Sequence, residues 1–418
     1  MNTRELSPDL AVSFLPMEAV EDQGTGGFEL QSRVVEEVSK GYTAFAEGDI
    51  IWAKINPCMQ NGKSTVATGL TNGLGFGSTE FHVLRPRSKQ VLAEFVWYFL
   101  SFTEFLEVAK SSFTGSAGQQ RVPAEFLREL PLPIPPLPIQ RELVATMNAA
   151  RTLRQQQLAE AEELQSGVNA VVLDALGIEP NPPQRAVFAV RAGQARGRVD
   201  ADFHSPRLQA FRQGLEEGKY PAQPIAKLCA AVASGFAAGR QDQAFDFEVG
   251  VPHLRPLNLD AQGELSLANT KFVPKTAVNK ADYCQIGEVL FNNTNSAELV
   301  GKSTVFELTR ACACSNHMTR LRLHPTAEPH YVAAVFNALR SIGYLSLVCT
   351  KFNNQAGINT ETLMELQIPV PPLSIQREIV AEVQRRRTAA RTLREAAETG
   401  WAAAKAAFEA RLLGTEPV

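Results

Sequence analysis

The sequence predicts an α+β protein built from two tandem copies of one domain, with two long antiparallel helices forming a coiled-coil spacer between the copies. Three observations predict this fold class. Segments of the chain recur in the same order, short apolar runs alternate with glycine turns, and two long stretches lack proline and carry apolar residues at helical spacing.

The repeat is clearest in two proline-rich segments, PIPPLPIQRE at 133–142 and PVPPLSIQRE at 369–378, which lie 236 residues apart. Further matches keep the same order at offsets of 237 to 239, and they pair 48–52 with 287–291, 61–65 with 300–304, and 84–85 with 321–322. A repeat of this length indicates a duplicated domain and not a solenoid unit. About forty residues ahead of the first match in copy two have no counterpart in copy one, so we expect a first domain that is short at its N-terminal side.

Each copy begins with an α+β globular part. Apolar runs that follow a glycine, such as GDIIWAKI and GEVLFNNT, are typical of buried strands, and helical stretches are expected around 93–108 and 331–347. We expect the chain to divide into a first globular domain, a long helix, a linker, a second globular domain and a second long helix, at 1–138, 139–178, 179–197, 198–374 and 375–418.

The two long helices follow the proline-rich segments, because prolines such as Pro135 and Pro371 disfavour a helix interior. Neither 141–176 nor 377–413 contains proline, and each would be about 54 Å long as a helix. Their apolar stripes predict helix packing and subunit docking through Leu143, Met147, Leu164, Val168, Ile379, Val383, Leu393 and Phe408. The alternative is that each helix packs on its own domain.

Composition narrows the class of protein. The 418 residues are 44% hydrophobic and 20% charged, which is typical of a globular chain. No apolar run is long enough to suggest a membrane span, and six scattered cysteines favour a reducing, cytoplasmic environment. The net charge of −3 argues against a uniformly basic nucleic-acid binder, although a basic face depends on local placement.

No catalytic or metal site is expected in this chain. The Gly-Lys-Ser triplets at 62–64 and 301–303 lack the earlier glycine of a phosphate-binding loop. Cys312, Cys314 and His317 lie close in sequence but lack the paired spacing of a zinc site, and they indicate a buried cysteine pair.

The arrangement resembles the specificity subunit of type I restriction-modification systems. The resemblance is carried by the PPLxIQRE segments at 135–142 and 371–378, each followed by a long helix, and by the stretches at 48–63, 77–86 and 354–359. It implies two target-recognition domains that each read one half of a split DNA site. It also implies two methyltransferase subunits that dock on the helices and carry S-adenosylmethionine, usually to methylate adenine at N6. A restriction subunit that uses ATP and Mg²⁺ can join them, and the specificity subunit itself holds no cofactor.

Base reading requires hydrogen-bonding side chains on loops, since Asn and Gln suit adenine while Arg and Lys suit guanine. Polar clusters fall at matching places in the two copies. The candidates for DNA binding are Lys54, Asn56, Gln60, Asn61, Lys63, Gln119, Gln120 and Arg121 in copy one, and Asn292, Asn293, Asn295, Lys302, Lys351, Asn353, Asn354 and Gln355 in copy two.

The sequence therefore predicts a cytoplasmic, non-catalytic subunit that reads a bipartite, asymmetric site on double-stranded DNA. Three alternatives stay open. The chain is an interaction scaffold that no longer reads DNA, a one-sided specificity protein with a defective first domain, or an enzyme that acts alone.

Overall fold

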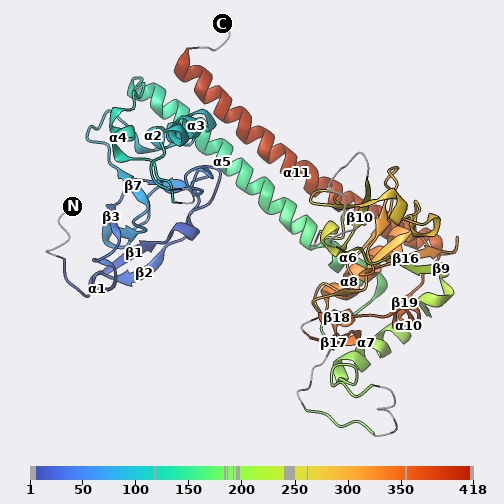
Figure 1. The fold of residues 1–418 in the computed structure, drawn as a ribbon. Helices are drawn as coiled ribbons and strands as arrows, with labels where there is room; N and C mark the ends of the chain where they lie inside the picture. The colour runs from blue at the N-terminus through green and yellow to red at the C-terminus, as the bar shows by residue number, and fades with distance from the viewer. Residues whose placement is uncertain are drawn as a thin grey trace. The chain divides into compact units, whose positions relative to one another are not determined.

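The computed structural model describes residues 6–116, 119–182, 185, 187–191, 193, 198–239, 250–260, 262–353 and 355–414. The chain divides into two compact units. Unit 1 comprises Met1–Ala159 with Arg394–Val418, and unit 2 comprises Glu160–Leu393. Both long helices contribute to both units, so this division differs from the expected separation into globular domains and free-standing helices. Figure 1 shows mixed helices and strands in each unit, which confirms the α+β class.

Unit 1 contains two small sheets and a group of helices. Strands β1 (Ala11–Leu15), β2 (Gln31–Val34), β3 (Thr43–Ala46) and β6 (Leu74–Gly77) form one sheet in the order β2-β1-β6-β3, in which β1 and β6 are parallel. Strands β4 (Ile50–Ala53), β5 (Ser64–Val66) and β7 (Phe81–Leu84) form an antiparallel sheet in the order β5-β4-β7. The α-helices are α1 (Val35–Val38), α2 (Ala93–Leu100), α3 (Thr103–Ser111), α4 (Ala124–Glu129), most of α5 (Leu137–Ser166) and the C-terminal part of α11 (Leu373–Leu413).

Unit 2 repeats both sheets. Strands β10 (Gly250–Leu254), β11 (Lys271–Pro274) and β15 (Ala313–Cys314) match β1, β2 and β6, and the pair β10–β15 is again parallel. Strands β12 (Val289–Asn292), β14 (Ser303–Val305) and β16 (Met318–Leu323) match β4, β5 and β7 with the same antiparallel pairing. Helix α8 (Pro329–Ser341) takes the place of α2, and α9 (Tyr344–Val348) follows it. The sequence repeat is thus a repeat of topology.

Unit 2 also contains a segment that has no counterpart among the described residues of unit 1. It comprises α7 (Pro206–Glu216), β8 (Ala222–Pro224) and β9 (Cys229–Ser234). Strand β9 extends the second sheet by pairing with β16, and β8 pairs with β19 (Gln367–Pro369). Helix α7 buries Leu208, Phe211 and Leu215 in the main core of unit 2. These elements lie in the stretch that the sequence comparison found only in copy two.

A buried glutamine explains the repeated IQRE motif. Gln140 accepts a hydrogen bond from the backbone of Leu92 (2.9 Å) and donates to the carbonyls of Gln90 (2.9 Å) and Pro135 (2.7 Å). Its counterpart Gln376 accepts from the backbone of Glu328 (2.9 Å) and donates to the carbonyl of Pro371 (2.8 Å). Each glutamine therefore ties the proline-rich segment to the start of a domain helix, since Leu92 and Glu328 are the N-caps of α2 and α8.

The long helices begin earlier than the proline pattern predicts. Helix α5 starts at Leu137, because Pro138 falls in its first turn, where the missing N–H costs no hydrogen bond. It ends at Ser166, and Gly167 separates it from α6 (Val168–Leu176), which closes on Gly177 in the left-handed conformation. Helix α11 runs without a break from Leu373 to Leu413.

Within unit 1 the two long helices lie against each other and run antiparallel (Figure 1). Arg154 of α5 forms an ion pair with Glu398 of α11 (2.7 Å). Glu142, which precedes Arg154 on α5, pairs with Arg411, which follows Glu398 on α11 (3.0 Å), as antiparallel helices require. The C-terminal part of α11 also packs on the domain helices. Phe408 lies 5.6 Å from Phe95 between ring centroids.

A pair of acids at this contact gives the stability of unit 1 a predicted pH dependence. Burial raises the pKa of Glu409 to about 7, helped by a hydrogen bond with Glu104 of α3, while Lys405 opposes the shift. A folded-state pKa above the ordinary value means that the stabilisation is present at low pH and is lost as the pH rises toward and through about 7.

We therefore expect the free energy of unfolding of unit 1 to fall by about 1 kcal/mol or less between pH 5 and pH 8 from this pair, because Glu104 is exposed and screened. Urea unfolding followed by tryptophan fluorescence measures this, since Trp52, Trp97 and Trp401 all lie in unit 1. Glu409→Gln should flatten the profile over this range, and an unchanged slope in that variant would contradict the assignment.

Candidate nucleic-acid interface

In unit 2, a β-hairpin carries several of the predicted DNA-binding residues. Strands β17 (Thr350–Phe352) and β18 (Gln355–Gly357) pair antiparallel around a turn in which Asn353 has a φ of 43°. Strand β18 also pairs with β13 (Thr294–Asn295), which directly follows β12. The hairpin therefore joins two clusters that lie more than fifty residues apart in the sequence.

Unit 1 builds the same feature at the matching positions. Thr114 and Arg121 form an antiparallel bridge, and Arg121 also bridges Ile55, just after β4. The backbone N–H of Asn56 donates to the carbonyl of Gln120 (2.9 Å). The structure thus brings together the two predicted polar clusters within each copy, as expected for a surface formed jointly by them.

The hairpin in unit 2 is the more open of the two. Lys351, Asn353 and Gln355 are exposed, and Asn295 is half-buried beside them. Lys351, Asn353 and Gln355 border an open cavity of about 550 Å³ that is also lined by 296–298. Asn354 lies outside the described residues. Phe352, which the polar pattern did not single out, is 50% exposed on the same strand and offers a flat apolar ring to a partner.

In unit 1 most of the candidate DNA-binding side chains are less exposed to solvent than those of the unit 2 hairpin. Asn61 and Gln119 are exposed, whereas Lys54, Asn56, Gln60 and Gln120 are half-buried. The guanidinium of Arg121 forms a two-pronged pair with Glu80 at 2.7 and 2.8 Å. This pair lowers the pKa of Glu80. Arg121 is therefore already paired within the chain, which argues against its expected contact with DNA.

The lysines of the two Gly-Lys-Ser triplets bind backbone carbonyls of their own units. Lys302 is buried and donates to the carbonyls of Leu259 (2.6 Å) and Pro256 (3.2 Å). Lys63 donates in the same way to the carbonyl of Val20 and lies 3.6 Å from Asp22. Each lysine binds the turn that follows β1 or β10, and these contacts argue against the expected DNA contacts of Lys63 and Lys302.

The side chains of Asn292 and Asn293 are also bound within unit 2, which argues against their expected contact with DNA. Asn292 is fully buried and donates to the carbonyl of Leu299 (2.9 Å). Asn293 is 9% exposed and donates to the carbonyl of Asn316 (3.1 Å) and the hydroxyl of Thr319 (2.9 Å). Both side chains support the loop that leads from β12 to β13, because their amides satisfy backbone groups.

A contrast between two lysines tests this reassignment. Lys302→Glu should destabilise unit 2 by about 3–5 kcal/mol, since it places a carboxylate against two buried carbonyls. Lys54→Glu changes a half-buried lysine and should leave the melting temperature almost unchanged. Thermal unfolding followed by circular dichroism measures both variants. Equal melting temperatures for Lys302→Glu and the unmodified protein would contradict the buried role.

A duplicated ion pair further supports the interior of each copy. Asp49 binds Arg85 at 2.5 and 2.6 Å and accepts the N–H of Ala46. In unit 2, Glu288 binds Arg322 at 2.9 Å and accepts the N–H of Gln285. These residues account for the matching GDI and GEV sequences. They stabilise the turns that precede β4 and β12, and these two strands lead into the loops of the candidate interface.

Most of the residues expected to dock partner subunits are buried in the hydrophobic cores of this chain. Leu143, Met147 and Phe408 are buried in the helical core of unit 1. Val168, Ile379 and Val383 are buried in the main core of unit 2. Leu164 and Leu393 are half-buried. The six buried residues pack within their own chain, and this burial argues against the expected docking of partner subunits through them.

The described residues contain no group of three or more His, Cys, Asp or Glu side chains arranged to hold a metal ion. Cys314 faces Cys284, with 3.2 Å between the sulfur atoms, and burial raises the pKa of the neighbouring Cys312 to about 12. The expected cysteine pair therefore exists, but its partner is Cys284 and not Cys312.

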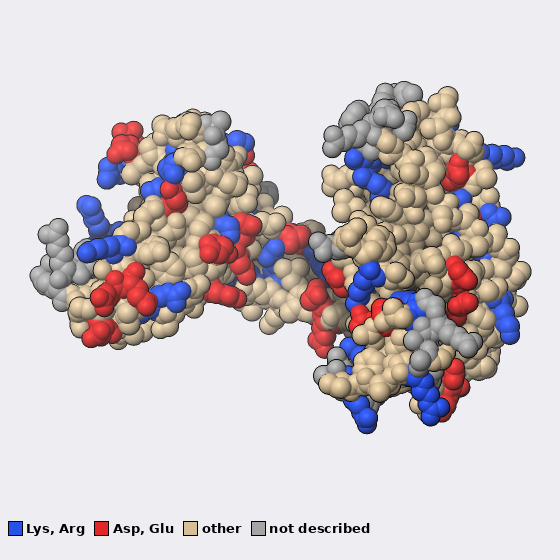
Figure 2. Space-filling view, turned by 60° about the horizontal axis from the view of Figure 1, so that its bottom comes forward, with Lys and Arg blue, Asp and Glu red and all other residues tan. Residues whose placement is uncertain are grey.

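Charge is mixed over the surface. On the face shown in Figure 2, Lys and Arg side chains are interspersed with Asp and Glu on each unit. This agrees with the small net charge of −3. Among the described residues, every helix is too short or too polar to cross a membrane.

Comparison with known proteins places part of the chain in a family. Residues 25–163 match the family model of the type I restriction modification DNA specificity domain. The chain is 38% identical over 165 residues to the type I restriction enzyme EcoAI specificity subunit of Escherichia coli, covering 38% of this chain and 28% of that protein. It is 39% identical over 137 residues to the EcoEI specificity subunit of the same organism, covering 33% of this chain and 23% of that protein.

The fold agrees with these matches. A chain in a solved structure that concerns complex assembly and conformational transition of the type I R-M system superposes with a TM-score of 0.59 at 16% identity, covering 97% of this chain and 91% of that one. The aligned sequence spans less than a third of the length of the EcoAI and EcoEI subunits. Over residues 25–163 the chain thus matches the type I restriction modification DNA specificity domain, and over a part of its length it is similar to type I restriction enzyme specificity subunits.

Proposed function

We propose that this chain selects the DNA site for a type I restriction-modification complex by reading a bipartite, asymmetric sequence. The observation that carries the proposal is the pair of hairpins at 114–121 and 350–357, which stand at equivalent points of a duplicated domain. Their side chains differ. Lys351 and Phe352 correspond to Gly115 and Ser116, so the two copies offer different groups to a partner. Different groups at equivalent places suit two different half-sites.

The recognition domains proposed are 1–138 and 198–374, joined through the helices at 139–178 and 375–418 across the linker at 179–197. Helix α11 alone has 41 residues, or about 60 Å at the rise of an α-helix. One turn of DNA measures about 34–36 Å, so helices of this length can set a gap between half-sites. The antiparallel contacts Arg154–Glu398 and Glu142–Arg411 support the paired helices that such a spacer needs.

Catalysis is assigned to partners. Two methyltransferase subunits would bind the exposed faces of the helices and bring S-adenosylmethionine, and a restriction subunit would bring ATP and Mg²⁺. The reading chain supplies the sequence context that a pocket holding one extruded base does not contact.

Selection from random double-stranded DNA tests the proposal. The chain is assembled with its methyltransferase partner, and bound DNA is sequenced over several rounds. We expect two short conserved blocks at one fixed spacing. Enrichment of no sequence would contradict the proposal and favour a scaffold that no longer reads DNA.

A one-sided reader is the second candidate. The ion pair of Arg121 with Glu80 in unit 1 favours it, because this guanidinium is already bound within the chain. The same selection distinguishes the two candidates, since a one-sided reader enriches a single block.

A further inference from the structure

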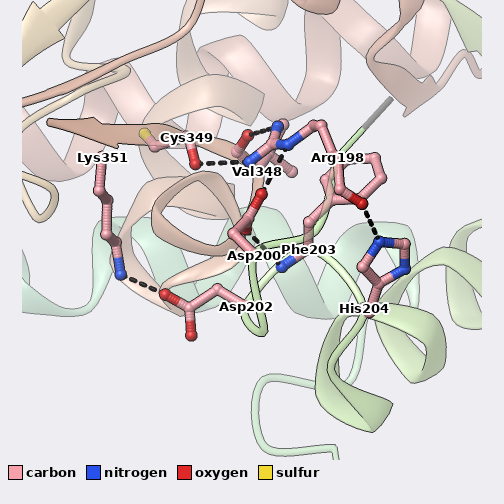
Figure 3. A network of polar contacts seen from close by, with 8 residues as sticks. All are labelled: Arg198, Asp200, Asp202, Phe203, His204, Val348, Cys349 and Lys351. Atoms are coloured by element: carbon pink, nitrogen blue, oxygen red, sulfur yellow. Dashed lines mark hydrogen bonds and ion pairs between the residues drawn. The ribbon is translucent and has the colours of Figure 1, made fainter. Parts of the chain in front are cut away.

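In unit 2 a short segment, residues 198–204, is hydrogen-bonded to the backbone just ahead of the β17–β18 hairpin (Figure 3). The guanidinium of Arg198 donates to the carbonyl of Val348 through Nη1 (2.7 Å) and to the carbonyl of Cys349 through Nη2 (2.8 Å). These carbonyls end helix α9 and directly precede β17. The C-terminal carbonyls of a helix lack partners within the helix and attract a cation, so Arg198 satisfies two of them at once.

Arg198 is itself fixed from several sides. Its Nε donates to Asp200 (2.8 Å), and its guanidinium lies over the ring of Phe203, 4.2 Å from the centroid. Arg212 contacts the same ring at 4.6 Å. The ring of His204 is hydrogen-bonded to the carbonyl of Arg198 (2.6 Å). The side chain therefore has one well-defined position, which makes it a rigid support and not a mobile surface arginine.

The same segment also holds the hairpin through a side chain. Asp202 forms an ion pair with Lys351, which lies on β17 beside Phe352 (Figure 3). The strand is thus held by its backbone at one end and by a side chain in its middle. Asp202 and Lys351 are both about half exposed, so this ion pair alone is weak, and the Arg198 contacts carry most of the restraint.

Unit 1 has a different arrangement at the equivalent place. The residues ahead of its hairpin are the end of α3, where the hydroxyl of Ser111 donates to the carbonyl of Val108 (2.6 Å) and that of Ser112 to Ala109 (2.6 Å). These bonds are local and tie α3 to itself. The long-range restraint described for the unit 1 hairpin lies at its other end, where Arg121 pairs with Glu80, so the two copies hold their hairpins at different places.

We propose that Arg198 is a positioning residue that fixes the orientation of the β17–β18 hairpin and thereby determines base preference in one half of the DNA site only. This inference rests on the proposed function. Contacts to base edges require the donor and acceptor to meet within a narrow range of distance and angle. A hairpin that tilts at its base loses this match, whereas attraction to phosphates tolerates the movement.

The test compares Arg198→Ala with Arg198→Lys and with the control Arg207→Ala. Arg207 also donates to a carbonyl, that of Ile342 (2.9 Å), and also lies over an aromatic ring, that of Phe211 (5.6 Å), but it makes no contact with the hairpin among the described residues. In the selection described above, Arg198→Ala should lose preference in one block by about tenfold per selected base while the other block persists. Arg198→Lys keeps one of the two donors and should be intermediate, and Arg207→Ala should keep both blocks.

Hydrogen exchange of the free protein gives a readout that does not depend on DNA. Arg198→Ala should speed the exchange of amides in 350–357 by at least about tenfold and leave 114–121 unchanged. Unchanged exchange in 350–357, or retention of both blocks, would overturn the inference. Loss of both blocks together with a lowered melting temperature would also overturn it and would indicate a merely structural role. If the unmodified protein enriches no DNA, the proposed function fails, and hydrogen exchange still decides whether Arg198 positions the hairpin.

Discussion

Replacing Lys351, Asn353 and Gln355 together by alanine is expected to lower the affinity of the assembled complex for its DNA site by about 100-fold or more. The three side chains are exposed on one hairpin of unit 2, and Lys351 can exchange its weak, half-exposed ion pair with Asp202 for a contact with DNA. Each well-placed base contact contributes about 1–3 kcal/mol of discrimination, and a lysine adds a phosphate contact. Binding is measured by fluorescence anisotropy on the selected site at fixed salt.

The matched control is Lys275→Ala, which removes one exposed lysine from a turn elsewhere in unit 2. It should change affinity by less than about threefold. Thermal unfolding of both variants should match that of the unmodified protein. If the triple variant binds as tightly as the control, the hairpin is not the reading surface of unit 2.

Phe408→Ala is expected to destabilise unit 1 by about 3–5 kcal/mol. Phe408 is 2% exposed, and its ring lies 5.1 Å from Phe102 and 5.6 Å from Phe95 between centroids. Truncation leaves a cavity in the helical core where the C-terminal part of α11 meets α2 and α3. Because all three tryptophans lie in unit 1, urea unfolding followed by tryptophan fluorescence reports on this core directly.

Leu413→Ala is the control for this change, because Leu413 lies near the end of the same helix and is 68% exposed. Its effect should be within about 0.5 kcal/mol. A Phe408→Ala protein as stable as the control, but impaired in binding the methyltransferase, would restore the docking role that the sequence pattern predicts and that the burial of this residue opposes.

The duplication and the elements of each copy could be predicted from the sequence, because glycine turns, apolar runs and prolines are local signals. The matching sequences at 48–52 and 287–291 lead into equivalent strands, β4 and β12. The positions of the two hairpins could also be inferred, because polar clusters recur at matching places in the two copies. These features depend on neighbours in the chain or on the repeat itself.

The roles of single polar residues could not be predicted in the same way. Lys302 and Lys351 look alike in sequence, yet one is buried against carbonyls and the other is exposed on a hairpin. The difference arises from contacts across more than forty residues, which no local pattern encodes. The equal recurrence of Lys63 and Lys302 was in fact a signal of structure, because two domains that read different bases need not keep the same side chain at the contact.

Lengthening both long helices tests most directly the central claim that paired helices set the distance between two reading domains. One heptad is inserted after Gln156 in α5 and one after Ala396 in α11, near the contact of Arg154 with Glu398, so that helical register is preserved. Seven residues add about 10.5 Å, or about three base pairs. Selection from random DNA should then return the same two blocks with a gap about three base pairs longer. The same blocks at an unchanged gap would contradict the claim.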